Sequence, residues 1–214
     1  MNDQNINFYD NLGVDPFKKL SEIGGFNTYV DLEVIYPFIE RANSILELGA
    51  GYGRCLDFFL GKNFKGRLIA VEKAKPYLAY LQANYVGKVE ILDVDIKRLE
   101  VTEKVDAILW MFSGIIDFSR AEQLMAIKKL SSFLNPGGNL IIDIPRIGFK
   151  TYANHKDNQR LTLKNEYGVL ECYIPSIEDI KAYVEEATLS GFTIKEYNTT
   201  SEKARTVYIL HKGK

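Results

Sequence analysis

Short apolar runs rich in isoleucine, valine and leucine alternate along this chain with longer stretches whose apolar residues lie three and four positions apart. The short runs are typical of strands buried on both faces of a sheet, and the longer stretches are typical of helices that cover such a sheet. The alternation therefore predicts an α/β fold in which the first five strands are parallel. Strands are expected at residues 44–48, 67–71, 88–92, 105–111 and 139–144, followed by an antiparallel pair at one edge, at 192–197 and 206–211.

Helices are expected in three of the connections between these strands, at residues 55–63, 76–85 and 120–134. Pro76 opens the second of them, where the missing amide donor of proline costs least. After the third, the turn sequence at residues 135–138 (NPGG) predicts a break before the fifth strand. Ser176, followed by two acidic residues, predicts the start of a last helix, which we expect Gly191 to close.

Two regions interrupt the alternation and are candidate lids rather than parts of the framework. Residues 1–43 hold a lead rich in tyrosine and phenylalanine that runs into a helix expected at residues 29–42. Residues 146–174 hold two β-like runs around Gly168, which predict an inserted hairpin. The length of 214 residues and the hydrophobic content of 46% are those of one globular domain, so residues 1–214 are expected to form a single domain.

Charge and composition argue against several classes of protein. Lysine and arginine total 27 and aspartate and glutamate total 28, and this balance disfavours binding to a nucleic-acid backbone or an anionic membrane. No apolar window approaches the roughly 20 residues of a membrane helix, and the start lacks the pattern of a signal peptide, so a cytoplasmic protein is expected. Two cysteines (Cys55, Cys172) and two histidines (His155, His211) give little support for a disulfide scaffold or a bound metal, and no metal is expected.

The most specific motif is an apolar strand that ends in an acidic residue and a glycine-rich turn, at residues 45–54 (ILELGAGYGR). Glycine lets a backbone turn sharply and approach a ligand without a Cβ in the way. The glycines follow a GxGxG spacing, whereas the nicotinamide-type GxGxxG fingerprint needs glycine where Arg54 stands. The carboxylate of Glu47 opposes the charge of a pyrophosphate and suits a ligand with an ammonium or sulfonium centre.

With this motif the chain resembles the class I S-adenosylmethionine-dependent methyltransferases, whose first motif is an acid followed by GxGxG. Further matches follow in order on the expected elements, over roughly residues 40–145. They are Val71-Glu72-Lys73 at the end of the second strand, Asp93-Val94-Asp95-Ile96 after the third, Trp110-Met111-Phe112-Ser113 after the fourth and Leu134-Asn135-Pro136-Gly137-Gly138 before the fifth. The resemblance implies a Rossmann-like, mostly parallel seven-stranded sheet with helices on both faces and an antiparallel edge strand.

The resemblance also implies S-adenosyl-L-methionine as the cofactor and assigns part of it to the first two motifs. Glu47 is expected near the amino group of the ligand, directly or through water. The turn formed by Gly49, Ala50 and Gly51 is expected beneath the methionine moiety. Glu72 is expected to accept hydrogen bonds from both ribose hydroxyls, a task for which the two oxygens of a carboxylate are suited.

The later motifs are expected to hold the adenine. Asp95 would accept from the adenine amino group while the amide of Ile96 donates to a ring nitrogen, with Asp93 as the alternative to Asp95. The remaining candidates for cofactor binding line the adenine and sulfonium side or adjoin the ribose, and they are Trp110, Met111, Phe112 and Lys73.

Single residues outside these motifs leave alternatives open. Arg54 either contacts the carboxylate of the cofactor or begins a helix and faces solvent. His155 is a candidate general base, with an exposed loop histidine as the alternative. Cys55 is predicted to lie in the core. Tyr9 and Tyr29 either close over the site, which we favour because they lie in a candidate lid, or pack the first helix onto the sheet.

Residues 1–30 and 146–174 are expected to form the acceptor-site cap, above the carboxyl ends of the strands where ligands bind in open α/β sheets. Their aromatic residues would supply an apolar wall that excludes water, and tyrosine hydroxyls would orient a polar acceptor. The alternative is that both regions merely cover the sheet. The candidates for substrate contact are Tyr9, Tyr29, Phe149 and Tyr152, with Phe8 and Phe26 in the same wall.

The sequence thus predicts methyl transfer from S-adenosylmethionine to an oxygen or nitrogen of a small molecule, with the protein aligning the acceptor and excluding water. The run WMFS at residues 110–113 differs from the Asn/Asp-Pro-Pro-Tyr pattern of enzymes that methylate amines of nucleic-acid bases, which disfavours that subclass without excluding RNA or protein. One alternative is a nicotinamide-dependent oxidoreductase, against which Arg54 and the antiparallel ending argue. Another is a non-catalytic sensor or accessory protein that binds S-adenosylmethionine. The sequence indicates neither the acceptor nor the oligomeric state.

Overall fold

The computed structural model describes residues 3–146, 154–155 and 157–214. The α-helices are α1 (Asp3–Leu12), α2 (Val14–Ile23), α3 (Val30–Ile35), α4 (Arg54–Gly61), α5 (Lys75–Asn84), α6 (Arg120–Ser132) and α7 (Ile177–Glu186). Short 3-10 helices are η1 (Tyr36–Phe38), η2 (Ile96–Arg98) and η3 (Gly114–Asp117). The strands are β1 (Ser44–Leu48), β2 (Arg67–Glu72), β3 (Glu90–Asp93), β4 (Val105–Trp110), β5 (Leu134–Pro145), β6 (Asn154–His155), β7 (Arg160–Asn165), β8 (Gly168–Tyr173), β9 (Gly191–Asn198) and β10 (Ala204–His211).

Seven of these strands form one sheet, in the order β3-β2-β1-β4-β5-β10-β9. The strands from β3 to β5 in this order run parallel, whereas β10 is antiparallel to both β5 and β9. The predicted Rossmann-like, mostly parallel sheet with an antiparallel pair at one edge is therefore confirmed. Strands β6, β7 and β8 form a separate antiparallel sheet.

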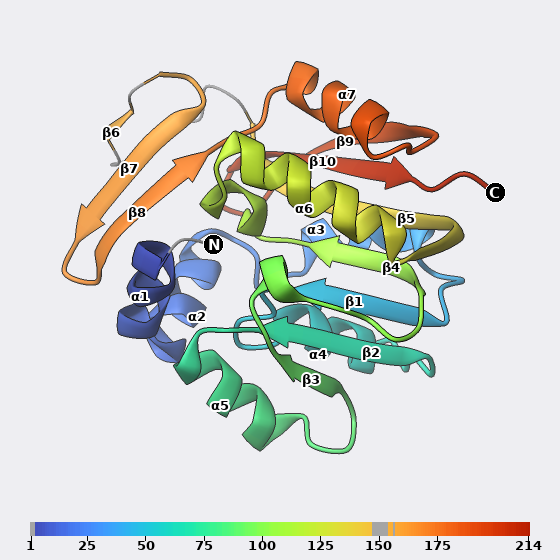
Figure 1. The fold of residues 1–214 in the computed structure, drawn as a ribbon. Coiled ribbons are helices and arrows are strands. Elements are labelled where there is room, and N and C mark those ends of the chain that lie inside the picture. The colour runs from blue at the N-terminus through green and yellow to red at the C-terminus, as the bar shows by residue number, and fades with distance from the viewer. Residues whose placement is uncertain (1–2, 147–153, 156) are drawn as a thin grey trace.

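Helices cover both faces of the large sheet, which explains why its central strands are apolar throughout. In Figure 1, α6 and α7 lie in front of the sheet, and α3 and α4 lie behind it. Each side chain of β1 from Ile45 onward is buried, whichever face it points to. Burial of both faces removes the alternation of polar and apolar residues that a half-exposed strand would show.

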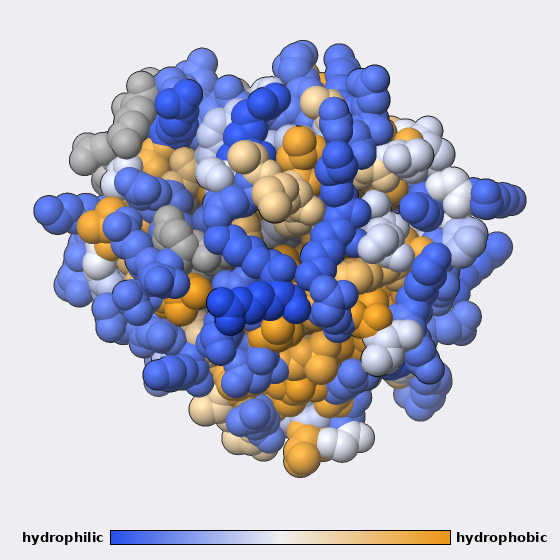
Figure 2. All heavy atoms as spheres, in the orientation of Figure 1, coloured by the Kyte–Doolittle hydropathy of each residue, from blue (hydrophilic) through white to orange (hydrophobic). Residues whose placement is uncertain are grey.

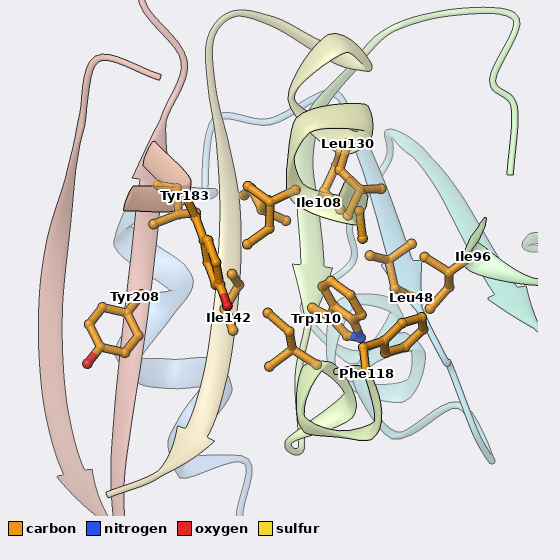
Figure 3. Packing of buried hydrophobic residues seen from close by; sticks show 14 of the residues in the cluster. Leu48, Ile96, Ile108, Trp110, Phe118, Leu130, Ile142, Tyr183 and Tyr208 are labelled. Atoms are coloured by element: carbon orange, nitrogen blue, oxygen red, sulfur yellow. The ribbon is translucent and has the colours of Figure 1, made fainter. Parts of the chain in front are cut away.

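The largest hydrophobic cluster lies between the sheet and the helices in front of it. Figure 3 shows Ile108 and Trp110 of β4 and Ile142 of β5 packed together with Leu130 of α6. A second cluster fills the space under α3 and α4. In Figure 2 apolar side chains also reach the surface low in the centre, below α6, where the connection from β3 to β4 contains η2 in place of an α-helix.

Three boundaries differ from the sequence prediction by more than two residues. The helix expected at residues 29–42 ends at Ile35 and continues only as the short η1, because Pro37 has no amide to extend the α-helical ladder. The NPGG turn is a bulge inside β5 and not a break before it, since Leu134 already pairs with Val105. Helix α7 ends well before Gly191, and the chain turns at Thr188, whose φ is 54°.

The N-terminal segment forms two helices, α1 and α2, where the sequence indicated only an aromatic lead. Figure 1 shows α1, α2 and the hairpin of β7 and β8 together at the end of the large sheet to which the parallel strands point. Helix α1 packs against β8, which links these two regions across the molecule. No helix among the described residues combines the length and the hydropathy that a membrane crossing requires.

Candidate functional site

A pocket of about 730 Å³ opens at the carboxyl ends of β1, β2, β3 and β4, beneath α1 and α2. We call it the main pocket. It lies where ligands bind in open α/β sheets. Its walls come from the strand ends and from the N-terminal segment, and they consist of Ile6, Tyr9, Phe17, Gly49, Gly51, Val71, Glu72, Lys73, Ala74, Tyr77, Val94, Asp95, Ile96, Trp110, Met111, Phe112, Gly114, Asp117 and Phe118.

The glycine-rich turn after β1 forms one wall of the main pocket. Gly49, Gly51 and Gly53 have φ of 65°, 56° and 85°, values that residues with a Cβ rarely adopt. A Cβ on Gly53 would lie 2.5 Å from the Tyr85 hydroxyl, so the third glycine also makes room for a side chain of the core. The predicted ligand-side glycines, Gly49 and Gly51, line the pocket, and Ala50 between them is buried.

Glu72 at the end of β2 ties this turn to the neighbouring strand. One of its oxygens, Oε2, accepts a hydrogen bond from the Gly51 amide at 2.8 Å. The other, Oε1, accepts from the amides of Lys73 at 2.7 Å and Ala74 at 2.8 Å. Burial raises the pKa of Glu72, while these three amides oppose the rise. Oε2 keeps acceptor capacity toward the pocket, because each carboxylate oxygen can accept two hydrogen bonds.

Glu47, one residue before the end of β1, is buried and is not a wall residue of the main pocket. Its Oε2 has no hydrogen-bond partner among the described residues. Burial raises the pKa of Glu47 to about 7, although the Cys55 thiol and the Arg54 guanidinium oppose the rise. A buried carboxylate oxygen without a partner fits the predicted ammonium group of a ligand, since buried polar groups are normally hydrogen-bonded.

We expect replacement of Glu47 by glutamine to remove part of the pH dependence of stability. The pKa of Glu47 is about 7 in the folded protein and 4.5 ordinarily, so the folded state holds the proton more tightly than the unfolded state. The contribution of this proton to the free energy of unfolding is complete below pH 4.5 and is lost as the pH rises through 7. The amide of Glu47→Gln does not titrate, so its free energy of unfolding should not fall in this range. The difference in free energy of unfolding, Glu47→Gln minus wild type, should therefore be up to about 3 kcal/mol larger at pH 8 than at pH 4.5. Urea unfolding at both pH values measures this difference.

Glu100→Gln provides the control for this measurement, because the Glu100 side chain is 79% exposed. Its free energy of unfolding should follow the wild type at both pH values. An equal pH dependence in Glu47→Gln and the wild type would show that Glu47 does not titrate in this range.

The segment after β3 forms the opposite wall. Asp95 caps η2 by accepting from the Lys97 amide at 2.8 Å, and it lines the main pocket together with Ile96. Lys73 also lines the pocket, and its Nζ bonds to Asp93 at 3.1 Å. Asp93 is half exposed in this surface pair and is not part of the pocket wall. The geometry therefore favours Asp95 over Asp93 as the acidic residue that faces a ligand.

The end of β4 brings Trp110, Met111 and Phe112 to the pocket, as the sequence predicted. Phe112 and Ser113 have φ of 51° and 69°, which is the left-handed region in two successive residues that are not glycine. Such strain persists only where surrounding contacts hold it. Here the Ser113 amide donates to the Asp143 carbonyl at 3.1 Å, and its hydroxyl accepts from Arg205 at 2.7 Å.

Aromatic side chains of the N-terminal helices close the main pocket from above. The ring of Phe17 in α2 makes edge contacts with Tyr9, Tyr52, Tyr77 and Phe112, at centroid distances between 5.4 and 6.0 Å. This cluster joins α1 and α2 to the ends of β1 and β4. Tyr9 is thus a pocket residue, as its position in the candidate lid suggested.

Asp117, in η3, is a pocket residue that the sequence did not reveal. Its side chain is buried, and burial raises its pKa to about 7. The Tyr9 hydroxyl donates to its Oδ2 at 2.9 Å, and the Cys172 thiol lies 3.9 Å from its Oδ1. The only signal in the sequence is its place a few residues after the fourth-strand motif.

Two predicted site residues lie elsewhere. Arg54 neither faces solvent nor lines the main pocket, because its guanidinium is buried against Asp31, at 2.9 Å from Nη1 to Oδ1, and also donates to the Phe26 carbonyl. Tyr29 packs against Phe58 in the cluster behind the sheet and is not a wall residue of the pocket. Cys55 is in the core, as expected.

The remaining candidates fall in or near the two lid regions. Phe8 is buried and contacts Tyr167 of the hairpin turn. Phe26 is buried against Phe112, with a centroid distance of 4.6 Å. His155 belongs to β6, where its backbone pairs with that of Leu161. The predicted acceptor contacts Phe149 and Tyr152 lie outside the described residues.

Comparison with known families adds an independent finding on the part of the chain that builds the pocket. Residues 45–138 match a family model described as a methyltransferase domain. The match runs from β1 into β5, so it includes the glycine-rich turn, Glu72 and Asp95. No curated protein sequence matches the chain.

Solved structures share the fold at low sequence identity. An S-adenosylmethionine-dependent methyltransferase from Clostridium acetobutylicum ATCC 824 is 17% identical, with a TM-score of 0.71 over 92% of this chain and 99% of that one. CalS10, an amino pentose methyltransferase from Micromonospora echinaspora with its cofactor bound, is 16% identical, with a TM-score of 0.64 over 90% and 95%. The 1,6-didemethyltoxoflavin-N1-methyltransferase of Burkholderia thailandensis is 14% identical, with a TM-score of 0.68 over 94% and 84%. At these identities the likeness establishes the fold alone.

Proposed function

We propose that the chain is an S-adenosylmethionine-dependent methyltransferase, which transfers the methyl group of this cofactor to an oxygen or nitrogen of a small molecule. The match of residues 45–138 to a methyltransferase-domain model supports this proposal. The observation that carries the proposal is the main pocket. It gathers the glycine-rich turn, two strand-end carboxylates and an apolar segment after β4 at one edge of the sheet. Each of these features matches one polar or apolar part of the cofactor.

The residues of the pocket would bind and orient the cofactor, which supplies a methyl group on a positively charged sulfur when bound. Oε2 of Glu72 has acceptor capacity for a ribose hydroxyl, and Asp95 and the Ile96 amide suit the edge of an adenine. Oε2 of Glu47, which has no hydrogen-bond partner within the described ranges, would accept a hydrogen bond from the amino group. Because the electrophile belongs to the cofactor, the protein's contribution is alignment of the acceptor and exclusion of water.

The cover of the pocket supports a small molecule as the acceptor. Side chains from α1 and α2 lie over the pocket, so an acceptor must fit beneath a wall formed by Tyr9, Phe17 and Phe112. We propose that residues 1–43 and the inserted segment at 146–174, which carries the hairpin of β7 and β8, act as the acceptor-site cap of a single domain. Two of the structural neighbours, the amino pentose methyltransferase CalS10 and the 1,6-didemethyltoxoflavin-N1-methyltransferase, are consistent with this proposal.

Calorimetry with S-adenosylmethionine and S-adenosylhomocysteine tests the cofactor, and NAD serves as the competing ligand. We expect both sulfur compounds to bind with dissociation constants below about 1 mM. Injection of NAD should release no more heat than the dilution control. Binding of NAD without the other two would favour an oxidoreductase instead.

A screen with radiolabelled methyl donor separates an enzyme from a sensor or accessory protein. The protein is incubated with small-molecule fractions of a metabolite extract, and label in a product other than the donor identifies transfer. Label in at least one fraction supports the proposed function. Cofactor binding without transfer to any fraction, or to added RNA or protein, would favour the non-catalytic alternative.

A further inference from the structure

A second cavity, which we call the side pocket, adjoins the main pocket. It lies between the hairpin of β7 and β8 and the start of α6, and has a volume of about 860 Å³. Asp117 and Phe118 line both pockets, so they form the partition between the two. The remaining wall of the side pocket is more polar and includes Ser119, Arg120, Glu122 and Arg160.

Among the residues that the structure describes, the side chains that donate hydrogen bonds to the Asp117 carboxylate are neutral. Its two partners are the neutral hydroxyl of Tyr9 and the neutral thiol of Cys172. Arg120 and Arg160, in the wall of the side pocket, pair with Asp179 and Asp157 instead. A buried carboxylate in this setting favours a ligand that brings a positive charge.

The contacts that dock α1 onto the hairpin do not use this carboxylate. Asn5 donates from Nδ2 to the Asp117 backbone carbonyl at 3.0 Å and to the Glu171 carbonyl at 3.0 Å. Its Oδ1 accepts from the Glu171 amide at 3.2 Å. The Asp117 carboxylate adds a contact to Tyr9 of α1 and a contact to Cys172 of the hairpin, and each of its oxygens keeps capacity for a second hydrogen bond.

Resting on the proposed function, we propose that the acceptor is an amine, that its body occupies the side pocket, and that the Asp117 carboxylate binds its ammonium group and accepts a proton from it. The N–H bond breaks and its proton moves to an oxygen of Asp117, which leaves a lone pair on nitrogen. That lone pair forms the new N–C bond with the methyl carbon of the cofactor. The C–S bond breaks, its electron pair stays on sulfur, and the positive charge passes from sulfur to the methylated nitrogen.

The pKa of Asp117 suits proton transfer from an ammonium group better than proton transfer from an alcohol. Burial raises the pKa of Asp117 to about 7, against which the Tyr9 hydroxyl acts. Aliphatic ammonium groups have pKa values of about 8 to 10, so the proton transfer to such a carboxylate is only slightly unfavourable. An alcohol is a far weaker acid. The other titratable groups that act on Asp117 are Tyr9, Cys172 and the N-terminal amino group, whose positive charge lowers the pKa of Asp117. Burial and the Asp117 charge raise the pKa of Tyr9 and of Cys172, so both stay neutral.

The test compares amines with alcohols of the same carbon skeleton, in wild-type protein and in Asp117→Asn. The probes are glucosamine and glucose, ethanolamine and ethylene glycol, and benzylamine and benzyl alcohol, each with radiolabelled methyl donor. We expect label in at least one amine and in no alcohol, and a rate that rises with pH through about 7 as Asp117 loses its proton. In Asp117→Asn, kcat should fall at least about a hundredfold and the acidic limb of the pH profile should disappear.

Two further variants separate proton transfer from a structural effect. Tyr9→Phe removes the hydrogen bond that lowers the pKa of Asp117, so the acidic limb should move to higher pH. Asp15→Asn, at an exposed position of α2, should behave as the wild type. Each variant is checked for cooperative unfolding and for S-adenosylhomocysteine binding within about twofold of the wild type, which shows that the fold and the cofactor site persist.

Three results would overturn this inference. They are label in alcohols but not in amines, label in none of the amines, and an Asp117→Asn variant with the wild-type rate and pH profile. The first and third leave the proposed function intact, because methyl transfer is still observed. Failure of the wild-type protein to bind the cofactor at all would instead contradict the proposed function itself.

Discussion

Replacing Glu72 with alanine should weaken the binding of S-adenosylhomocysteine at least tenfold. The carboxylate stands at the pocket end of β2, and a hydrogen bond to a charged group contributes about 1.5 to 3 kcal/mol. One such bond to a ribose hydroxyl is sufficient for this loss, since about 1.4 kcal/mol corresponds to a factor of ten in the dissociation constant. The variant also loses the acceptor that holds the Gly51 amide. Calorimetry on wild type and variant measures the ratio.

Two variants make this prediction specific. Glu72→Gln keeps the size of the side chain and can keep one oxygen for the amides of Lys73 and Ala74, so it should unfold nearly as the wild type while still binding the cofactor more weakly. Asp93→Asn, at the end of the adjacent strand but in a half-exposed surface pair, should bind it within about twofold of the wild type. Unchanged affinity in a folded Glu72→Ala protein would remove Glu72 from the site.

The fold was predictable because its main signal is local in the sequence. Strands such as β1 and β4 are buried on both faces, and each therefore appears as a short, nearly continuous apolar run. Ser176 likewise acts through neighbours only a few residues away, and the structure confirms it as the N-cap of α7. The ends of elements were less predictable, since Leu134 belongs to β5 only by its pairing with Val105 in another strand.

The predicted site divides in the same way. Gly49, Gly51, Glu72 and Asp95 reach the pocket because each stands at the end of a strand whose place in the sheet follows from the fold. Asp117 was not predictable, because its partners are distant in sequence: Tyr9 is 108 positions before it and Cys172 is 55 positions after it. No periodic pattern encodes such a contact.

Arg54 shows how a distant partner overturns a local interpretation. From its place at the start of a helix after the glycines, Arg54 was predicted either to contact the cofactor or to face solvent. Both predictions assumed that its side chain was available to a ligand or to water. Instead it pairs with Asp31 of α3, 23 residues earlier in the chain. A second buried pair, Arg205 with Asp143, lies on the other side of Phe26, and both guanidinium groups stand over that ring at 5.5 and 5.3 Å.

These two ion pairs anchor the N-terminal segment to the sheet through Phe26 and Asp31, which both follow α2 in the chain. Breaking a buried pair by removing one partner costs several kcal/mol, about 3 to 5, so the anchor is firm. Helices α1 and α2 precede this anchor, and they contact the pocket, the hairpin and α5. They can therefore be removed without disturbing either buried pair.

Removal of residues 1–25 should reduce methyl transfer to background while weakening S-adenosylhomocysteine binding only severalfold. The deletion takes away Tyr9 and Phe17 and opens the pocket to water, which an acceptor site must exclude for the alignment of acceptor and methyl group to be effective. The strand-end residues that would hold the cofactor, Glu72 and Asp95 among them, stay in place. Transfer is measured on the acceptor that the labelled-methyl screen identifies, and binding is measured by calorimetry.

The interpretation depends on a folded truncated protein, so cooperative urea unfolding of residues 26–214 is measured first. Full-length Phe17→Ala should reproduce part of the loss, because its ring contacts both Tyr77 and Phe112 in the pocket wall. Full-length Leu20→Ala should keep the wild-type rate, since Leu20 lies on the same helix but is 49% exposed. Full transfer activity in the truncated protein would show that α1 and α2 only cover the sheet, because an acceptor could then be aligned without them.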